Sequence, residues 1–307
     1  MPRQPSGELP WTPAETKQLV SHAEVIAALR DKVEGGMATD DEKKQFAKAV
    51  FALKKSIEDK ERPSQVILAK SADGHELRFD LNEIRKTAEA FYRGHGLEKL
   101  ADQLPQNIRL SPQQIERIKE AAKEGFDRVF IFPSIEQLAT SRQTLIEQCA
   151  TQPSAALSGT EQYTAPYIDD TAKTPVIRNR PTQKAYLLLY SSQPIKEETK
   201  NLTHPQVTEL FNQKKWNGLT LEEYLLLQRL EAESRGNHSF DAYSTNAVDS
   251  NSTRLMDSTS DAGASRVLDA GWYPGNRQVR VLSNSSGGAS PNLGARPSVV
   301  LSLEPLP

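Results

Sequence analysis

The chain has 307 residues, of which 25% are charged and 37% hydrophobic, and its net charge is −2. This length suits two domains, or one domain with a helical extension. A net charge so close to zero provides no general basic field, so we expect no nucleic-acid partner. The single cysteine, Cys149, excludes an intramolecular disulfide framework and a cysteine-rich zinc site.

The first residues, MPRQPSGELPWTPAE, lack the apolar run of a signal peptide. No stretch of the sequence approaches the roughly 18 consecutive apolar residues that a membrane-spanning helix needs. We therefore expect no membrane span and a cytoplasmic location.

Two helices are predicted at the start of the chain. From Pro13, apolar residues recur at helical spacing until Gly35-Gly36 ends the pattern. A second helix begins at Thr39 or Asp40 and ends near Arg62-Pro63. Its apolar stripe consists of Phe46, Ala49, Val50, Leu53 and Ile57. The two would form a helical hairpin, whose stripes we interpret as core packing, with a partner-binding face as the alternative.

Residues 65–150 continue the mostly helical N-terminal domain, which we place at 1–150. Asp73-Gly74 favours a tight turn between two short strands and therefore a small β-hairpin. Ser111 and Ser134 have the features of helix N-caps. The predicted elements after the hairpin are helices over about 82–100, 111–125 and 134–149 and a short buried strand at 127–133.

Residues 151–182 are rich in Thr, Ser, Pro and Ala without periodicity, which predicts a linker or long surface loop at the domain boundary. The second domain, 183–307, is predicted to be α+β. Its run Lys184–Tyr190 is typical of a central strand, and Thr220 with Glu223 forms a capping box that begins a helix ending at Gly236. A shorter helix fits 204–216, and strands are predicted at 266–272, 277–281 and 298–301.

No catalytic or metal-binding pattern stands out, so we expect no enzyme, no cofactor and no metal. The histidines lack metal-ligand spacing, there is no nucleophile elbow or phosphate loop, and Cys149 lies at an apolar helical position. Four aspartates in a polar stretch match no calcium loop, and we interpret them as solvated turn residues. The histidines are His22, His75, His95, His204 and His238, and the aspartates are Asp241, Asp249, Asp257 and Asp261.

Two segments resemble known proteins. Lys184–Leu230 resembles the middle of an uncharacterised bacterial family common in candidate-phylum genomes. The C-terminal block contains Gly271-Trp272, then Arg277–Val281, then Leu293–Leu301, and it resembles the end of the variable proteins of diversity-generating retroelements. In such proteins an error-prone reverse transcriptase rewrites the C-terminal coding region. The resemblance implies a C-type-lectin-like module whose fixed strands hold diversified side chains on a ligand-binding face.

The resemblance divides the C-terminal residues into two sets. The positions that it implies are scaffold are Trp272, Arg277, Val279, Val281, Leu293, Gly294 and Arg296, together with Gly271, Pro297 and Ser298. The positions that it implies are diversified are Tyr273, Gly275, Asn276, Leu282, Asn284, Ser285, Ser286, Gly287, Gly288, Ser290 and Asn292. Ser283–Ser290 consists of small residues and forms the soft part of this tail.

From the residues themselves, Trp272, Val279, Val281, Leu293 and Val299 can be buried together while alternate side chains point outward. We expect Arg296 to donate hydrogen bonds to loop carbonyls.

The implied function is non-catalytic binding of a protein or small-molecule ligand through the C-terminal loops. The alternatives are an enzyme on a scaffold like that of formylglycine-generating enzymes, and a phage-like structural or interaction protein.

Overall fold

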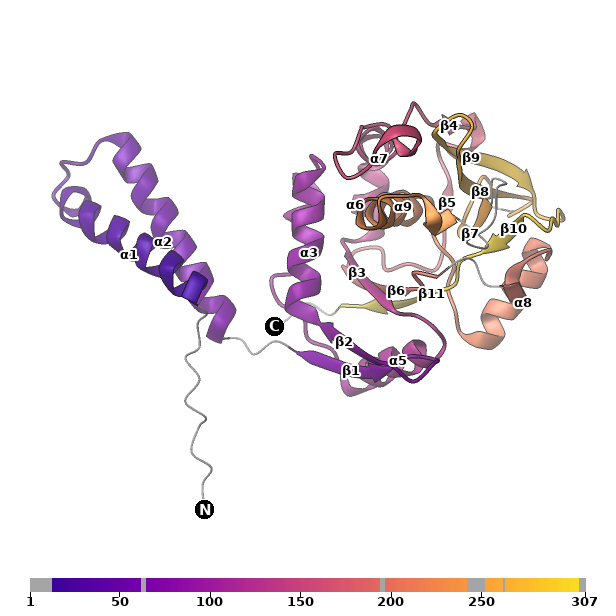
Figure 1. Cartoon of the computed structure of the whole chain (residues 1–307), viewed down its shortest axis with the longest axis horizontal. Coiled ribbons are helices and arrows are strands. Elements are labelled where there is room, and N and C mark those ends of the chain that lie inside the picture. Colours follow the sequence, from indigo (N-terminus) through magenta and orange to yellow (C-terminus); the bar gives the residue numbers. More distant parts are fainter. Residues whose placement is uncertain (1–12, 62–64, 194–196, 242–251, 262, 304–307) are drawn as a thin grey trace, which may run out of the picture. The chain divides into compact units, whose positions relative to one another are not determined.

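The computed structural model describes residues 13–61, 65–193, 197–241, 252–261 and 263–303. The chain divides into two compact units, Met1–Ser64 and Gln65–Pro307. The described residues form a mixed α+β protein with N-terminal helices and a curled C-terminal sheet (Figure 1). None of the described helices is both long and apolar enough to cross a membrane.

The first unit is the predicted helical hairpin. Helix α1 (Pro13–Glu34) and helix α2 (Asp40–Glu61) pack against each other, and Gly36 adopts φ +69 in the turn between them. Of the predicted apolar stripe, Ala49 is buried, whereas Phe46 and Leu53 are half-buried and Val50 is exposed; the Ile57 side chain lies outside the described residues. Among the side chains of the hairpin that the structure describes, few apolar ones are therefore buried.

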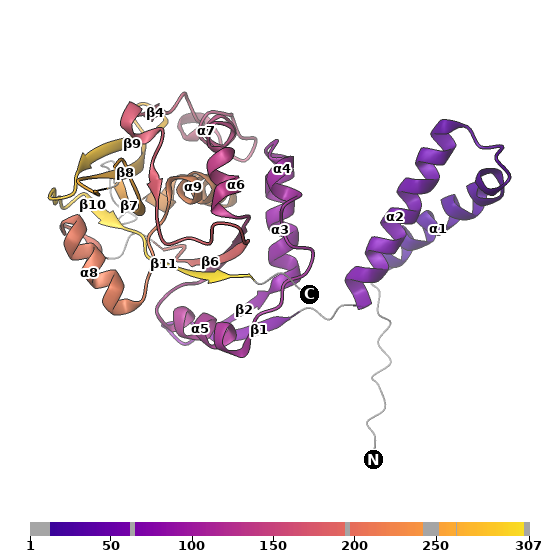
Figure 2. The same ribbon diagram turned by 180° about the vertical axis from the view of Figure 1, so that it is seen from behind.

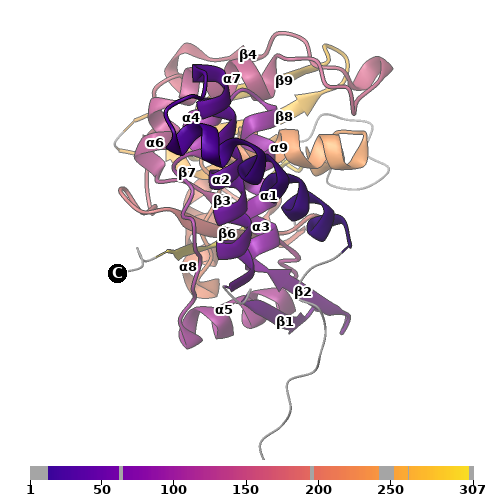
Figure 3. The ribbon, with the colours of Figure 1, turned by 90° about the vertical axis from the view of Figure 1, so that its left-hand side faces the viewer.

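The second unit begins with the predicted hairpin of β1 (Val66–Lys70) and β2 (Glu76–Asp80), against which α5 (Pro112–Lys123) packs (Figure 3). Helix α3 (Leu81–Gly94) ends earlier than predicted, because Gly96 at φ +67 interrupts the chain before the short α4 (Glu98–Ala101) (Figure 2). The predicted helix after Ser134 is likewise two helices, α6 (Ile135–Thr140) and α7 (Arg142–Ala150). The predicted N-caps at Ser111 and Ser134 are confirmed, and each is part of a capping box.

A three-stranded antiparallel sheet joins distant parts of the second unit. Strand β6 (Tyr186–Tyr190) is central, as predicted, between β3 (Arg128–Phe132) and β11 (Ser298–Ser302). All five residues of β6 are buried. Because β3 pairs directly with β6, residues 65–150 share one core with 183–307. The division of the chain therefore falls after Ser64 and not within residues 151–182.

The predicted linker is folded onto the second unit. It contains two-residue strands β4 (Tyr167–Ile168) and β5 (Val176–Ile177) and 3-10 turns η1 (Gly159–Glu161) and η2 (Asp170–Ala172). Strand β4 pairs with β9, and β5 pairs with β7. The sequence pattern missed these strands because each has only two paired residues.

The larger sheet has the order β10-β7-β8-β9-β4. Its main strands are β7 (Ser252–Thr259), β8 (Arg266–Tyr273), β9 (Gln278–Ser285) and β10 (Leu293–Ala295). The predicted strands at 266–272 and 277–281 are confirmed as β8 and β9. Strand β9 extends four residues beyond its predicted end at Val281, so Ser283, Asn284 and Ser285 of the soft segment are paired with β8.

Two helices connect the sheets. Helix α8 (His204–Lys214) lies beside β10, and α9 (Leu221–Arg235) runs through the middle of the unit, between α6 and α7 on one side and the larger sheet on the other (Figure 1). The capping box of Thr220 and Glu223 and the end at Gly236 are as predicted. Charged and polar residues of α9 are buried with its leucines, so the helix is packed on several sides.

Candidate functional site

The candidate diversified positions occupy two ends of the β8–β9 hairpin. Tyr273, Gly275 and Asn276 lie at its turn, whereas the positions from Asn284 to Asn292 lie at the opposite end, in and after the last residues of β9. Each strand has 8 residues, and at about 3.3 Å per residue the two ends are about 25 Å apart. Leu282 lies between them. The structure therefore presents two groups of these residues instead of one.

Accessibility separates the two sets. None of the eleven candidate diversified positions is buried: Tyr273, Leu282, Ser286 and Ser290 are half-buried and the others are exposed. Eight of the ten scaffold positions are buried; these are Gly271, Trp272, Val279, Val281, Gly294, Arg296, Pro297 and Ser298.

Two scaffold positions differ from that pattern. Leu293 is half-buried, and Arg277 is exposed in the turn with φ +52. Arg277 is held by its main chain, because its carbonyl accepts hydrogen bonds from Thr164 N at 2.7 Å and Thr164 Oγ1 at 2.9 Å. The main chain of Arg277, and not its exposed side chain, therefore makes these contacts with the rest of the unit.

The loop after β9 is anchored through its main chain. The buried Arg254 of β7 donates a hydrogen bond to the carbonyl of Gly288 at 2.9 Å and another to that of Leu202 at 2.8 Å. The Ser286 carbonyl accepts from His204 N at 2.9 Å, and Ser286 N donates to the Ser265 carbonyl at 2.9 Å. These bonds do not involve the loop's own side chains, so they do not depend on which side chains the loop carries.

Two candidate diversified positions are more constrained. The Asn284 amide donates to Oδ2 of the buried Asp269 at 2.8 Å, and Arg254 lies 3.6 Å from Oδ1 of the same carboxylate. Burial raises the pKa of Asp269. A Cβ atom at Gly288 would lie 3.2 Å from the Ser285 carbonyl oxygen, whereas one at Gly275 would meet nothing within 4 Å. Asn284 and Gly288 are therefore constrained by their neighbours, whereas Gly275 is not.

At the turn end, Arg280 of β9 lies between two tyrosines. Its guanidinium is 4.3 Å from the ring centroid of Tyr273 and 5.3 Å from that of Tyr167. Tyr167 belongs to β4 and pairs with Arg280 across the parallel strands. We call these three residues the tyrosine–arginine cluster. No sequence pattern points to Arg280 or Tyr167, because only the pairing of β4 with β9 brings them together.

Arg296 has the predicted structural role. Its Nη1 donates to the carbonyls of Ser191 at 3.1 Å and Gln193 at 2.9 Å, and Nη2 donates to the carbonyl of Phe240. The guanidinium also stacks on the Phe240 ring, 3.8 Å from its centroid. Arg296 therefore ties the segment before β11 to two other loops.

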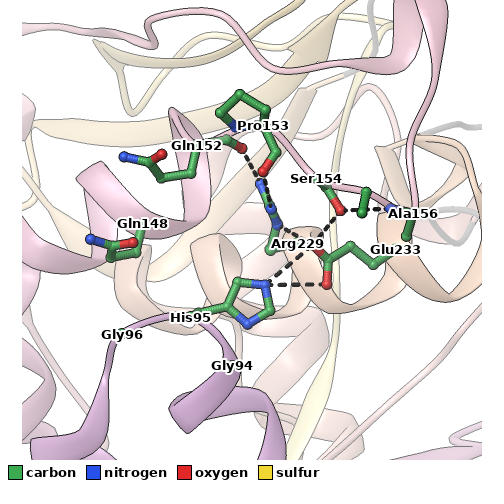
Figure 4. Close-up of a pocket in the computed structure, with 11 residues that line it drawn as sticks. Gly94, His95, Gly96, Gln148, Gln152, Pro153, Ser154, Ala156, Arg229 and Glu233 are labelled. Atoms are coloured by element: carbon green, nitrogen blue, oxygen red, sulfur yellow. Dashed lines mark hydrogen bonds and ion pairs between the residues drawn. The ribbon is translucent and has the colours of Figure 1, made fainter.

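A polar pocket lies on the far side of α9 from the larger sheet. It encloses about 500 Å³ between the end of α3, the loop 152–156 and α9 (Figure 4). Glu233 is the centre of its network: it accepts hydrogen bonds from Ser154 Oγ at 2.6 Å and Arg229 Nε at 2.6 Å, and His95 Nε2 is 3.2 Å away. The other nitrogen of His95, Nδ1, lies 2.8 Å from the Phe91 carbonyl oxygen.

The electrostatics of this pocket do not favour nucleophilic catalysis. Burial raises the pKa of Glu233, but hydrogen bonds from His95 and Ser154 and the charge of Arg229 outweigh it and lower the pKa to about 2. Such a carboxylate is a poor general base for the Ser154 hydroxyl. Arg229 also donates to the carbonyls of Gln152 and Pro153. The network therefore fastens α3 and the loop 152–156 to α9.

The remaining candidates have structural surroundings. Cys149 is 1% exposed, and burial raises the pKa of its thiol to about 12, as suits a buried small apolar residue. Asp257 is buried beside Arg180, and Asp261 accepts a hydrogen bond from Ser265 N at 3.0 Å; Asp249 and the Asp241 side chain lie outside the described residues. Within the described part of the chain, no group of three or more His, Cys, Asp or Glu residues is placed to hold a metal ion.

Comparisons with known proteins add no assignment: no family model matches the chain, and neither a curated protein nor a solved structure does.

Proposed function

We propose that the chain is a non-catalytic binding protein that presents a replaceable C-terminal surface on a fixed framework, as in the variable proteins of diversity-generating retroelements. The observation that carries this proposal is the main-chain anchoring of the loop after β9. Arg254, Ser265 and His204 hold the loop through hydrogen bonds to its backbone. A loop held in this way keeps its position when its side chains change.

The connectivity of residues 183–307 supports a C-type-lectin-like module. Its first and last described strands, β6 and β11, pair antiparallel, and the segment between them contains α8, α9 and the strands β7–β10. The buried residues Trp272, Val279 and Val281 belong to this framework. The partner is a protein or small molecule that contacts the accessible positions.

Two matched libraries displayed on yeast test the proposal. The first varies Ser285, Ser286, Gly287, Ser290 and Asn292, and the second varies Trp272, Val279 and Val281. We expect most members of the first library to be displayed as folded protein and most of the second to be lost, because only the second removes buried apolar surface. Equal loss from both libraries would contradict the proposal.

The coding DNA provides the second test. A copy of the 3′ coding end elsewhere in the genome, differing at template adenines and lying beside a reverse-transcriptase gene, is expected. The absence of such a copy here and in close relatives would refute diversification, and would leave the binding function to be tested by selection from the loop library.

A further inference from the structure

The tyrosine–arginine cluster contains a cation that has no acceptor of its own. No described residue accepts a hydrogen bond from the Arg280 guanidinium or forms an ion pair with it, and its Nε is buried without a partner. Arg180 and Arg229, by contrast, each donate to a carboxylate and to carbonyl oxygens. An arginine fixed in place with unused N–H donors is suited to an acceptor supplied from outside the chain.

The two rings determine how that acceptor would meet the guanidinium. Tyr273 and Tyr167 both contact Arg280, at 4.3 and 5.3 Å, and restrict the rotation of a side chain that is otherwise flexible. The planar guanidinium carries N–H groups along its edge in the geometry that pairs with both oxygens of a carboxylate. Tyr167 is 48% exposed, so the site is open to a ligand.

We propose that the tyrosine–arginine cluster binds a carboxylate side chain on an acidic peptide segment of a partner protein. The positive charge of Arg280 favours an anionic ligand. The two tyrosine rings provide apolar surface next to the guanidinium. A peptide can cover this apolar surface, whereas an inorganic ion cannot. Tyrosine and arginine also contribute a large part of the binding energy in protein interfaces. The proposal rests on the proposed binding function and specifies ligand chemistry at the turn end of the β8–β9 hairpin.

The tyrosine–arginine cluster combines a candidate diversified position with positions outside that set. Tyr273 is a candidate diversified residue, whereas Arg280 and Tyr167 are not in that set. The carboxylate contact of Arg280 would therefore stay constant while the residues around it change. This arrangement would give every version of the surface a shared preference for acidic partners and leave finer selection to the exposed neighbours.

The test observes Arg280 directly in the full chain labelled with ¹⁵N-arginine. The Nε–Hε resonance of Arg280 is assigned by its loss in Arg280→Lys. It is followed while acetyl-Gly-Glu-Gly-amide, acetyl-Gly-Gln-Gly-amide or inorganic phosphate is added. We expect a saturable shift with the glutamate peptide and at least about tenfold weaker binding of the glutamine peptide, because only a carboxylate forms the charge-assisted pair. Arg277, an exposed arginine three residues earlier, supplies the control resonance.

Two substitutions test the role of the rings. Tyr167→Phe keeps a ring over the guanidinium and should keep the affinity for the glutamate peptide within about twofold, whereas Tyr167→Leu should weaken it by about threefold or more. The proposal is overturned if no saturable shift occurs, if Arg277 and Arg280 respond equally, if the glutamine peptide binds as well, or if phosphate binds more tightly than the glutamate peptide. Failure of the loop library leaves this titration unaffected, so the two proposals fail separately.

Discussion

Arg180 donates hydrogen bonds to both carboxylate oxygens of Glu223, from Nε at 2.6 Å and from Nη2 at 2.8 Å. A third bond runs from Nη1 to Asp257 at 2.7 Å. The three side chains are 1%, 0% and 6% exposed. Burial alone lowers the pKa of Arg180, but the two carboxylates outweigh it and raise the pKa. This cluster fastens the segment 151–182 to α9 and β7.

Replacing Arg180 should destabilise the second unit strongly. Arg180→Met leaves two carboxylates buried without their cation, and breaking a buried ionic cluster in this way costs about 3–5 kcal/mol. Thermal unfolding measures the effect. Lys173→Ala is the matched control, because it removes the exposed ion pair with Asp170 and should change Tm little. An equal fall in Tm for both variants would show that the Arg180 cluster does not anchor the segment.

The loop after β9 should lose protection when its anchor is shortened. Arg254→Lys keeps a positive charge near Asp269 but provides one ammonium group in place of the guanidinium that reaches both Gly288 and Leu202. We expect faster hydrogen exchange in residues 286–292 with little change in the strands β8 and β9. Unchanged exchange in that peptide would remove the main support for backbone anchoring.

Two glycines should differ in their response to replacement by alanine. A Cβ atom at Gly218 would lie 2.2 Å from Met256 Cβ and 3.0 Å from its Cα, so the backbone must move, whereas at Gly275 the space is open. Overpacking of this kind costs about 1–3 kcal/mol, and we expect Gly275→Ala to stay within about 0.5 kcal/mol. Chemical denaturation measures both. A destabilised Gly275→Ala would argue that the turn is part of the framework.

Stability should fall in mild acid because His238 is buried in its neutral form. The imidazole stacks on Trp272 with ring centroids 3.5 Å apart, Gln228 Nε2 lies 2.6 Å from Nδ1, and the Glu161 carbonyl oxygen lies 2.8 Å from Nε2. Burial lowers the pKa of His238 from 6.5 to about 4, although the hydrogen bond with Glu161 opposes the shift.

A histidine with a lowered folded-state pKa contributes stability that is complete above 6.5 and is lost as the pH falls toward 4. We expect His238→Phe to reduce the loss of unfolding free energy across this window by on the order of 1–3 kcal/mol, measured by denaturation at each pH. Burial also lowers the pKa of His204 to about 4, so His204 continues to destabilise both the original protein and His238→Phe in acid. If the unfolding free energy of the original protein and of His238→Phe depended on pH in the same way, His238 would be excluded as a cause of the acid destabilisation.

Local chemistry explains what the sequence predicted correctly. The N-caps at Ser111, Ser134 and Thr220 each bond to a residue three positions later, so they can be recognised without tertiary information. The central position of β6 follows from five consecutive apolar or aromatic residues. The buried and accessible sets of the C-terminal block follow the alternation along β9, where Val279 and Val281 point into the core.

Contacts between segments that are distant in the chain explain which features the sequence did not predict. The pairing of β3 with β6 joins residues about sixty positions apart and moves the unit boundary to Ser64. Arg180 and Tyr167 lie in a segment whose composition resembles a loop, and their partners Glu223 and Arg280 lie far along the chain. These long-range contacts leave no periodic pattern within the segment, so the sequence alone does not indicate a role for its charged and aromatic residues.

Under the proposed diversification of the loop after β9, the position of β11 later in the chain has a genetic consequence. Strand β11 supplies one of the two neighbours of β6, and its residues Val299 and Leu301 are buried. Any rewriting of the loop that shifts the reading frame or introduces a stop codon removes this strand and leaves β6 unpaired on one side. Under that proposal, a copy with a broken reading frame would yield a chain that cannot complete this sheet, and proteases could remove such unfolded chains.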